Sequence, residues 1–495
     1  MAKFSFNRQA KYRLLREEEI KTIHEKALFI LERTGVKFDS EEALKILKDH
    51  GCDVDFDKQI AKIPGQLVLD SIKSTPEQIQ LYDREGNPGV LLDGNHPHFA
   101  PGSAPINFME SDGVTVRTAE ARDLRNISLV NDALDNIKLQ ATAVNLHDVP
   151  KLIGDSFRLY LLMQNSPKPA VSGAFSIHGI ADMREMLMAI AGGEDALREK
   201  PRVIFDICPS PPLKWTHISC QNIIDCARFG LPIETISVPM PGAASPATLA
   251  GSVLLHTVET LSGIVLAQCV APGTPMVYGG APMYFDMRFS TTSLNSMEAE
   301  LISAAYAQMA KFYGMPCHTY AALSDSKIVD VQAGLESGMS GLMALQAGIN
   351  VISGAGVIDF CNTFSIEKLA IDNEICGMAL RVAKGIECTE ETLAVDLINE
   401  LGPGGDFLST EHTFEWFKKE PYMPSAIIDR RNRGSWEESG KTDTFYRARK
   451  KVQEIIEGHK PLELDKERKE ALERVTKGIM ERLNINEIPL GPSLA

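Results

Sequence analysis

Residues 313–351 read YGMPCHTYAALSDSKIVDVQAGLESGMSGLMALQAGINV and contain one complete unit of a pattern that runs through most of the chain. The unit opens with Tyr313-Gly314-Met315-Pro316-Cys317, which is typical of a helix that ends at a left-handed glycine before an apolar strand. The apolar segment continues to Leu323, a polar loop follows, and a helical pattern runs from about Val331 to Ala347. A second glycine junction, Ala347-Gly348-Ile349-Asn350-Val351, then starts the next strand.

The same strand and helix alternation occurs repeatedly after residue 97, and a third glycine junction lies at Phe229-Gly230-Leu231-Pro232-Ile233. The predicted strands are His98–Ser103, Lys138–Val144, Pro169–Ala174, Arg202–Ile207, Ile233–Val238, Pro275–Gly280, Pro316–Ala322 and Asn350–Gly354. Each is followed by a helical pattern, and the strands are almost continuously apolar. This arrangement favours an α/β fold with a parallel (β/α)8 TIM-type barrel, and a doubly wound open sheet is the alternative.

The 495 residues are about twice the number that a barrel of this type needs, so both ends carry additions. We predict a helical N-terminal extension at residues 1–95, the barrel at residues 96–386, and a C-terminal helical extension at residues 387–495 that packs on the barrel. Within the first extension, one amphipathic helix ends at Gly35 and a shorter one is capped by Ser40.

The composition excludes several classes of protein. The 51 basic and 66 acidic residues give a formal charge of −15, and no window combines clustered Lys and Arg with aromatics, so no nucleic-acid partner is expected. The apolar run at residues 247–277 is interrupted by His256, Glu259 and Gln268, which predicts a buried helix and no membrane span. The nine cysteines include no Cys-x-x-Cys pair, which is typical of reduced thiols in the cytoplasm.

Side chains that follow the strands should gather at the C-terminal end of the barrel, where barrel enzymes carry out their reactions. Aromatic residues are frequent among them, and the faces of aromatic rings attract quaternary ammonium groups. Core packing is the alternative role for each ring. The candidate substrate-binding residues are Phe99, His147, Phe175, Tyr278, Tyr284, Phe285, His318, Tyr320, Lys327 and Phe360.

Cys and His side chains near the strand ends are candidate metal ligands, because zinc enzymes with this fold bind the metal through such side chains. Cys208, Cys317 and His318 follow or lie in predicted strands, but none of the histidines and cysteines has the spacing of a zinc site. We therefore predict no bound metal.

The polar loop after Leu323 carries a family resemblance. Ser324-Asp325-Ser326-Lys327, followed by Asp330, Gln332-Ala333-Gly334 and Glu336, resembles the trimethylamine:corrinoid methyltransferase family in its branch that lacks pyrrolysine. The resemblance extends to Gly402-Pro403-Gly404-Gly405-Asp406-Phe407-Leu408 near the C-terminus. It implies a methyltransferase that moves a methyl group from an amine to Co(I) of a corrinoid.

Gln332 stands where the archaeal relatives have pyrrolysine, which makes it the candidate catalytic residue. The imine of pyrrolysine is thought to hold a methylamine through the nitrogen lone pair, and glutamine cannot do this. A quaternary amine has no lone pair and already carries the charge that makes its methyl group transferable. The resemblance therefore implies a quaternary-amine substrate, best matched by glycine betaine with dimethylglycine as product, and Gln332 as a polar contact to it.

The chain has no Asp-x-His-x-x-Gly motif for binding cobalamin, so the resemblance implies a corrinoid supplied by a separate protein. The glycines that permit close backbone approach are candidate contacts to the corrinoid or to a substrate carboxylate, with tight turns as the alternative: Gly354, Gly356, Gly404 and Gly405. A homo-oligomer is expected. Two other functions stay open, a lyase or aldolase that uses Lys327 as a Schiff base, and a non-catalytic protein that binds quaternary amines.

Overall fold

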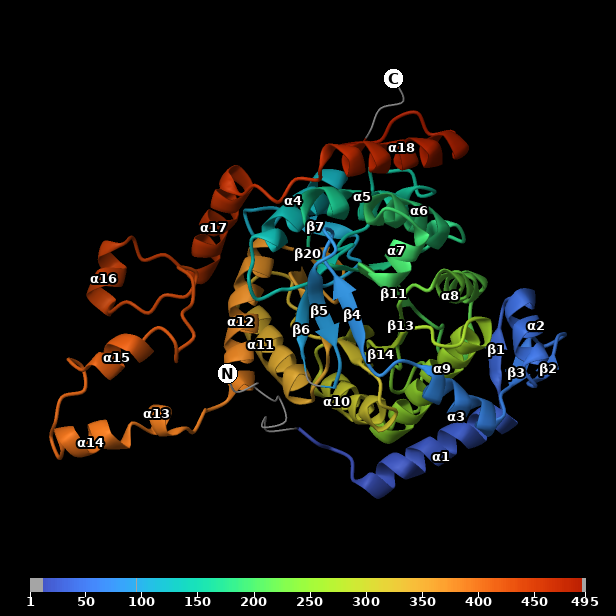
Figure 1. Ribbon diagram of the computed structural model, residues 1–495, viewed down its shortest axis with the longest axis horizontal. Helices are drawn as coiled ribbons and strands as arrows, with labels where there is room; N and C mark the ends of the chain where they lie inside the picture. The colour runs from blue at the N-terminus through green and yellow to red at the C-terminus, as the bar shows by residue number, and fades with distance from the viewer. Residues whose placement is uncertain (1–11, 95, 492–495) are drawn as a thin grey trace.

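The centre of the computed structural model, which describes residues 12–94 and 96–491, is a barrel of eight parallel strands (Figure 1). Around the barrel these are β6 (His98–Pro101), β18 (Val351–Ala355), β17 (Cys317–Tyr320), β14 (Met276–Gly280), β13 (Ile233–Ser237), β11 (Val203–Ile207), β10 (Ala170–Gly173) and β9 (Gln140–Ala141). The ring closes where the backbone oxygen of Phe99 accepts hydrogen bonds from the amides of Lys138 and Leu139. The predicted (β/α)8 barrel is therefore confirmed.

One long helix follows each strand and packs on the outside of the barrel. In chain order these helices are α4 (Ala121–Asp132), α5 (Gly154–Asn165), α6 (Gly179–Ala191), α8 (His217–Phe229), α9 (Leu249–Val270), α10 (Met297–Phe312), α11 (Val331–Gln346) and α12 (Ile366–Lys384). The predicted glycine junctions are confirmed, because Gly230, Gly314 and Gly348 have φ values of 70°, 70° and 74°.

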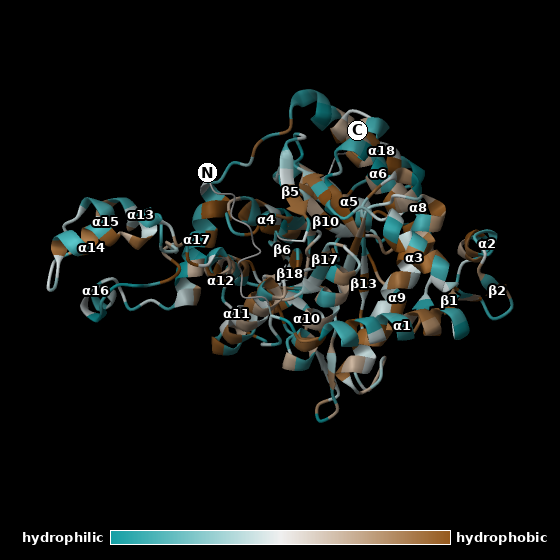
Figure 2. Ribbon diagram, turned by 60° about the horizontal axis from the view of Figure 1, so that its bottom comes forward, coloured by the Kyte–Doolittle hydropathy of each residue, from teal (hydrophilic) through white to brown (hydrophobic). Residues whose placement is uncertain are grey.

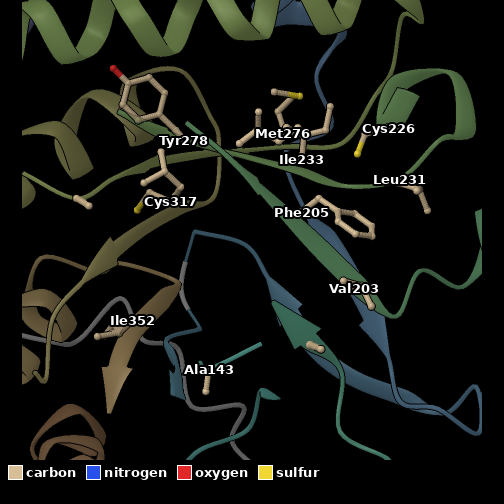
Figure 3. Packing of buried hydrophobic residues seen from close by; sticks show 14 of the residues in the cluster. Ala143, Val203, Phe205, Cys226, Leu231, Ile233, Met276, Tyr278, Cys317 and Ile352 are labelled. Carbon is tan, nitrogen blue, oxygen red and sulfur yellow. The ribbon is translucent and has the colours of Figure 1, made fainter. Parts of the chain in front are cut away.

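Among the described residues, helix α9 is long and apolar enough to cross a membrane. In the structure, however, 83% of its most apolar 18-residue stretch is buried inside the protein. Its prediction as a buried helix is confirmed. It packs against α1 (Glu17–Arg33), α3 (Gly65–Ser74) and α10, so its apolar surface belongs to the core. Figure 3 shows part of this core, in which Val203, Phe205, Ile233 and Met276 come from neighbouring strands.

The hairpin of β4 (Ile79–Tyr82) and β5 (Pro88–Leu92) closes the N-terminal end of the barrel (Figure 1). Its apolar side chains form one buried cluster with interior residues near the strand starts: Ile79, Leu81, Val90 and Leu92 with Ala100, Leu139, Val171, Ile204, Val277 and Val351. A small sheet of β1 (Val36–Phe38), β2 (Asp53–Asp55), β3 (Ile60–Lys62) and β12 (Lys214–Trp215), with α2 (Glu41–Asp49), flanks the barrel.

The C-terminal part divides into packed helices and a projecting segment. Helix α17 (Thr444–Gly458) packs on α12 and α4, and α18 (Lys466–Arg482) packs on α6 and α5. Between α12 and α17 the chain leaves the barrel and carries α13 (Glu390–Leu393), α14 (Val395–Leu401), α15 (Glu411–Trp416) and α16 (Arg433–Glu438), as Figures 1 and 2 show.

Candidate functional site

A pocket of about 520 Å³ opens at the C-terminal end of the barrel, opposite the β4–β5 hairpin. Its walls come from residues at or just after the ends of five barrel strands and from α5 and α8. The lining residues are Ser103, Ala104, Thr142, Asn145, Arg158, Gly173, Ala174, Phe175, Asp206, Ile207, Cys208, Thr216, Ile218, Ser219, Asn222 and Tyr320. The pocket thus lies where barrel enzymes bind their substrates.

Two carboxyl groups meet in the interior of the barrel at the base of this pocket. Asp206 on β11 and Glu234 on β13 are direct register partners in the sheet, so their side chains lie on the same face of neighbouring strands. Asp206 lines the pocket, and Glu234 is fully buried beside it. Apart from a proton that the pair can share, neither oxygen of Glu234 has a hydrogen-bond partner among the described residues.

Burial sets the charge of this pair. It raises the pKa of Asp206 to about 6, although the neighbouring Glu234 and Tyr320, which can donate hydrogen bonds to it, partly offset the effect. Burial and the charge of Asp206 raise the pKa of Glu234 well above its usual range. Near neutral pH the pair therefore carries a single negative charge, with the proton on Glu234. A buried carboxylate of this kind is suited to binding a cation.

His318 and Tyr320 on β17 also point into the barrel interior, closer to the C-terminal ends of the strands than the carboxyl pair. His318 is fully buried, lies 3.9 Å from Glu234, and has no hydrogen-bond partner for either ring nitrogen among the described residues. Burial lowers the pKa of His318 to about 3, so the ring is neutral. The Tyr320 ring stands edge to face with it, with centroids 5.2 Å apart, and the Tyr320 hydroxyl is 2.9 Å from Ser103 Oγ.

Arg158 places a positive charge on another wall of the pocket. It reaches in from α5, is 2% exposed, and donates from Nη2 to Asp155 at 3.0 Å. Its remaining hydrogen bonds go to the carbonyl oxygens of Thr142 and Gly173 at 3.3 Å, and its guanidinium lies 5.1 Å from the Phe175 ring centroid. These carbonyl bonds are long, so the guanidinium can also bind a carboxylate in the pocket.

The loop that follows β17 is held together by Glu336. One oxygen of Glu336 accepts hydrogen bonds from Ser324 Oγ at 2.6 Å and from the Asp325 amide at 2.8 Å. The other oxygen accepts from Gln332 Nε2 at 2.9 Å. Gln332 lies in the first turn of α11 with its side chain exposed, and it does not line the pocket.

The structure brings three of the ten predicted substrate-binding residues to the pocket. Phe175 and Tyr320 line it, and His318 lies below Tyr320. Two others point away from the barrel interior. Tyr278 donates from its hydroxyl to Thr257 on α9, and Phe99 is buried beneath α11 next to Gly341.

The other five predicted residues lie on the surrounding loops. Lys327 is exposed, donates to the backbone oxygen of Asp325 at 2.8 Å, and lies 3.7 Å from the centroid of Phe360. Tyr284 and Phe285 belong to a separate hairpin of β15 (Tyr284–Asp286) and β16 (Thr291–Ser293), and His147 is exposed after β9. None of these side chains lines the pocket.

None of the four predicted cofactor-binding glycines lines the pocket. A Cβ on Gly354 would come within 2.1 Å of the Ala321 oxygen, and one on Gly356 would meet the Phe364 ring at 2.4 Å. Close packing inside the protein therefore accounts for glycine at both positions. Gly404 and Gly405 lie in the projecting segment between α14 and α15.

Sequence reasoning did not identify Asp206, Glu234 or Arg158. The signal for the first two was present, because each is an acidic residue inside an otherwise apolar predicted strand. A charge in such a strand is buried, and buried carboxyl groups are expected at functional sites. Among the described residues no group of three His, Cys, Asp or Glu side chains is arranged to hold a metal ion.

Comparisons with known proteins assign the chain to a family. The family model described as trimethylamine methyltransferase (MTTB) matches residues 1–480. The chain is 34% identical to trimethylamine methyltransferase MttB of Desulfitobacterium hafniense, with 90% of this chain and 89% of the relative covered. It is also 34% identical to glycine betaine methyltransferase of Desulfitobacterium hafniense strain Y51, with coverage of 92% and 95%.

A solved structure with a similar fold is the Methanosarcina barkeri monomethylamine methyltransferase (MtmB), at a TM-score of 0.55, 10% identity, and coverage of 96% of this chain and 89% of that one. At this identity the likeness shows the fold alone, and it agrees with the barrel described above. The family assignment depends on the sequence matches, which span nearly the whole chain. The chain is therefore a methyltransferase that belongs to the trimethylamine methyltransferase family.

Proposed function

We propose that this methyltransferase moves a methyl group from glycine betaine to Co(I) of a separate corrinoid protein and releases dimethylglycine. The observation that carries the proposal is the pocket with two opposite charges, the Asp206 carboxylate at its base and the Arg158 guanidinium on its wall. Glycine betaine has the matching pair, a trimethylammonium group and a carboxylate. A relative named glycine betaine methyltransferase, 34% identical to this chain, supports the same substrate.

The residues of the pocket have a positioning task in this reaction. The ammonium group would lie against the Asp206 carboxylate and the ring of Tyr320, where the cation and the ring attract each other. The substrate carboxylate would bind Arg158 and direct one methyl group toward the pocket opening. Holding a methyl group in line with its acceptor contributes up to about 7 to 11 kcal/mol in favourable systems. The leaving amine takes the electron pair of the broken C–N bond, so no proton transfer is needed.

Exposed apolar side chains near the pocket support the proposal of a corrinoid as the methyl acceptor. Large apolar side chains on the loops at this end of the barrel are exposed, and Phe175, Met287 and Phe289 are 62%, 70% and 71% exposed. A large, partly apolar ring system would cover such side chains. When bound, the corrinoid supplies the Co(I) nucleophile. We propose a separate corrinoid protein as its carrier, and a cytoplasmic location.

The test of this function is an assay of the purified chain with chemically reduced cobalamin and a panel of amines. We expect glycine betaine to produce dimethylglycine with loss of the Co(I) absorbance, and trimethylamine to react at least about a hundredfold more slowly, since it lacks the permanent charge and the carboxylate. Preference for trimethylamine would contradict the proposal. Tight binding of betaine without any turnover would favour the non-catalytic alternative.

The lyase or aldolase alternative is weaker. A Schiff-base lysine requires a desolvated amine near the substrate. Lys327 is exposed, and its Nζ is engaged by the Asp325 oxygen and the Phe360 ring.

The pKa of Asp206 predicts how substrate binding depends on pH. The cation binds the ionised carboxylate, whose pKa is about 6 in the free protein. Affinity for glycine betaine should be nearly constant above pH 7 and should fall by up to about tenfold per pH unit below pH 6, as Asp206 becomes protonated. Isothermal titration calorimetry between pH 5 and pH 8 measures this. Binding that strengthens as the pH falls would contradict the assignment of Asp206.

Gln332 does not line the pocket, so we expect it to affect substrate binding only through its hydrogen bond to Glu336. The change Gln332→Ala removes one hydrogen bond to Glu336 and leaves its bonds to Ser324 and Asp325 in place. We expect KM to rise by about threefold and kcat to stay nearly unchanged, since a partly exposed hydrogen bond contributes about 0.5 to 1.5 kcal/mol. Steady-state kinetics measures the two constants. Complete loss of turnover with unaltered binding would instead make Gln332 catalytic.

A further inference from the structure

The segment of residues 386–419, here called the arm, stands away from the barrel (Figures 1 and 2). Arg381 of α12 holds its two ends together. It donates from Nη1 to the Gly385 oxygen at 2.9 Å and from Nε to the Glu420 oxygen at 2.7 Å. Between these ends the structure describes every residue, and none of them is buried.

The arm combines apolar and acidic side chains. Eight of its large apolar residues are between 44% and 83% exposed: Ile386, Leu393, Val395, Ile398, Phe407, Leu408, Phe414 and Phe417. Between Ile386 and Phe417 there are eight acidic residues and no lysine or arginine. So many exposed apolar side chains on one segment mark a surface that binds another macromolecule. Its negative charge favours a partner surface that is basic.

The same chain has a basic cleft at the start of α17. The cleft has a volume of about 1000 Å³, and its lining has more basic than acidic residues: Arg430, Arg431, Lys441, Arg447, Lys450 and Lys451 against Asp429, Asp443 and Glu454. Arg431 pairs with Asp429, whereas Arg430, Lys441, Lys450 and Lys451 form no ion pair within 4.0 Å among residues 12–94 and 96–491. Ile428 and Tyr446 add apolar surface to the cleft. It is therefore suited to a segment that is both acidic and apolar.

An apolar strip on α11 continues this cleft. Val331, Leu335 and Met339 follow each other at intervals of four residues, which places them on one face of the helix, and they are 79%, 58% and 50% exposed. A cavity of about 360 Å³ that is lined by Val331 and Asp443 connects the strip to the cleft, because Asp443 also lines the cleft. We call the strip and the cleft together the receiver surface.

We propose that two copies of the chain exchange their arms, so that the arm of each copy lies on the receiver surface of the other. No residue of the arm lines the basic cleft or the α11 cavity of its own chain. The hydrogen bonds of Arg381 to the Gly385 and Glu420 oxygens fix both ends of the arm in this position. The two surfaces match in apolar character and are opposite in charge. A two-fold exchange covers the arm and the receiver surface of each copy at the same time. Two-fold symmetry is also the usual symmetry of homodimers.

The experiment compares the solution mass of the full chain with that of charge-reversal variants, by light scattering and by sedimentation over a range of concentrations. We expect the unmodified chain to have twice its 54.3 kDa mass or an even multiple of it. The receiver variant Lys450→Glu/Lys451→Glu and the arm variant Glu400→Lys/Glu415→Lys should each weaken the association about tenfold or more. Combining the four changes should restore it.

The matched control is Lys21→Glu/Lys26→Glu, which reverses two exposed charges on α1, far from the arm in Figure 1. It should leave the association unchanged. A monomeric unmodified chain, or an oligomer that neither variant weakens, would overturn the proposal. A loss of association that the combined variant does not restore would also overturn it, because direct pairing of the two surfaces requires the rescue. Circular dichroism confirms that each variant folds.

Discussion

The change Asp206→Asn should weaken the binding of every quaternary amine by about a hundredfold. Asp206 carries the negative charge at the base of the pocket near neutral pH, and the substitution keeps the size of the side chain while removing that charge. Truncating one partner of a buried charge pair costs about 2 to 5 kcal/mol. Calorimetry with glycine betaine, choline and tetramethylammonium measures the effect. All three ligands should lose affinity to a similar extent, because they share only the cationic group.

Glu300→Gln is a matched control for this variant. Glu300 on α10 is also a fully buried carboxyl without a hydrogen-bond partner among the described residues, and burial raises its pKa to about 8. It is therefore neutral near pH 7 and does not line the pocket. The control should bind all three ligands with unchanged affinity. Equal losses in Asp206→Asn and Glu300→Gln would mean that the effect comes from the fold and that Asp206 does not bind the cation.

The change Arg158→Gln should separate ligands that carry a carboxylate from those that do not. We expect kcat/KM and affinity for glycine betaine to fall about 10- to 100-fold, since hydrogen bonds to a charged group contribute about 1.5 to 3 kcal/mol. Choline and tetramethylammonium have no carboxylate and should lose less than about threefold. Equal losses for betaine and choline would remove Arg158 from substrate recognition.

Arg158 also supports the fold through Asp155, so the variant needs its own control. Arg158→Lys keeps the positive charge but loses the planar fork, and we expect it to bind betaine with an intermediate affinity. Thermal unfolding of both variants shows how much stability they lose. Because choline and betaine are compared on the same variant, a general loss of stability cannot produce the expected difference between them.

The barrel was predictable because its signals are local. A glycine after each of three helices, followed by an apolar strand, predicts the alternation wherever it occurs, and Gly230, Gly314 and Gly348 all have the expected left-handed conformation. The β4–β5 hairpin was not predicted as the closure of the barrel, because that role depends on contacts with strands spread along the chain as far as Val351.

The candidate site was predictable only in part. The positions of the strand ends correctly predict that Phe175 and Tyr320 line the pocket. They do not predict the place of Tyr278, because side chains alternate between the two faces of a strand and the Tyr278 ring points to α9. Arg158 reaches the pocket from the middle of a helix, which no strand pattern indicates. Asp206 and Glu234 face each other only through the register of β11 and β13.

The β4–β5 hairpin has a kinetic consequence. Because it seals one end of the barrel with apolar side chains, a small molecule enters and leaves the pocket through the other end. A corrinoid protein that delivers its cofactor to that same end would block the route while it is docked. We therefore expect a compulsory order in turnover, with the amine taken up before the carrier arrives and the demethylated product set free after it departs.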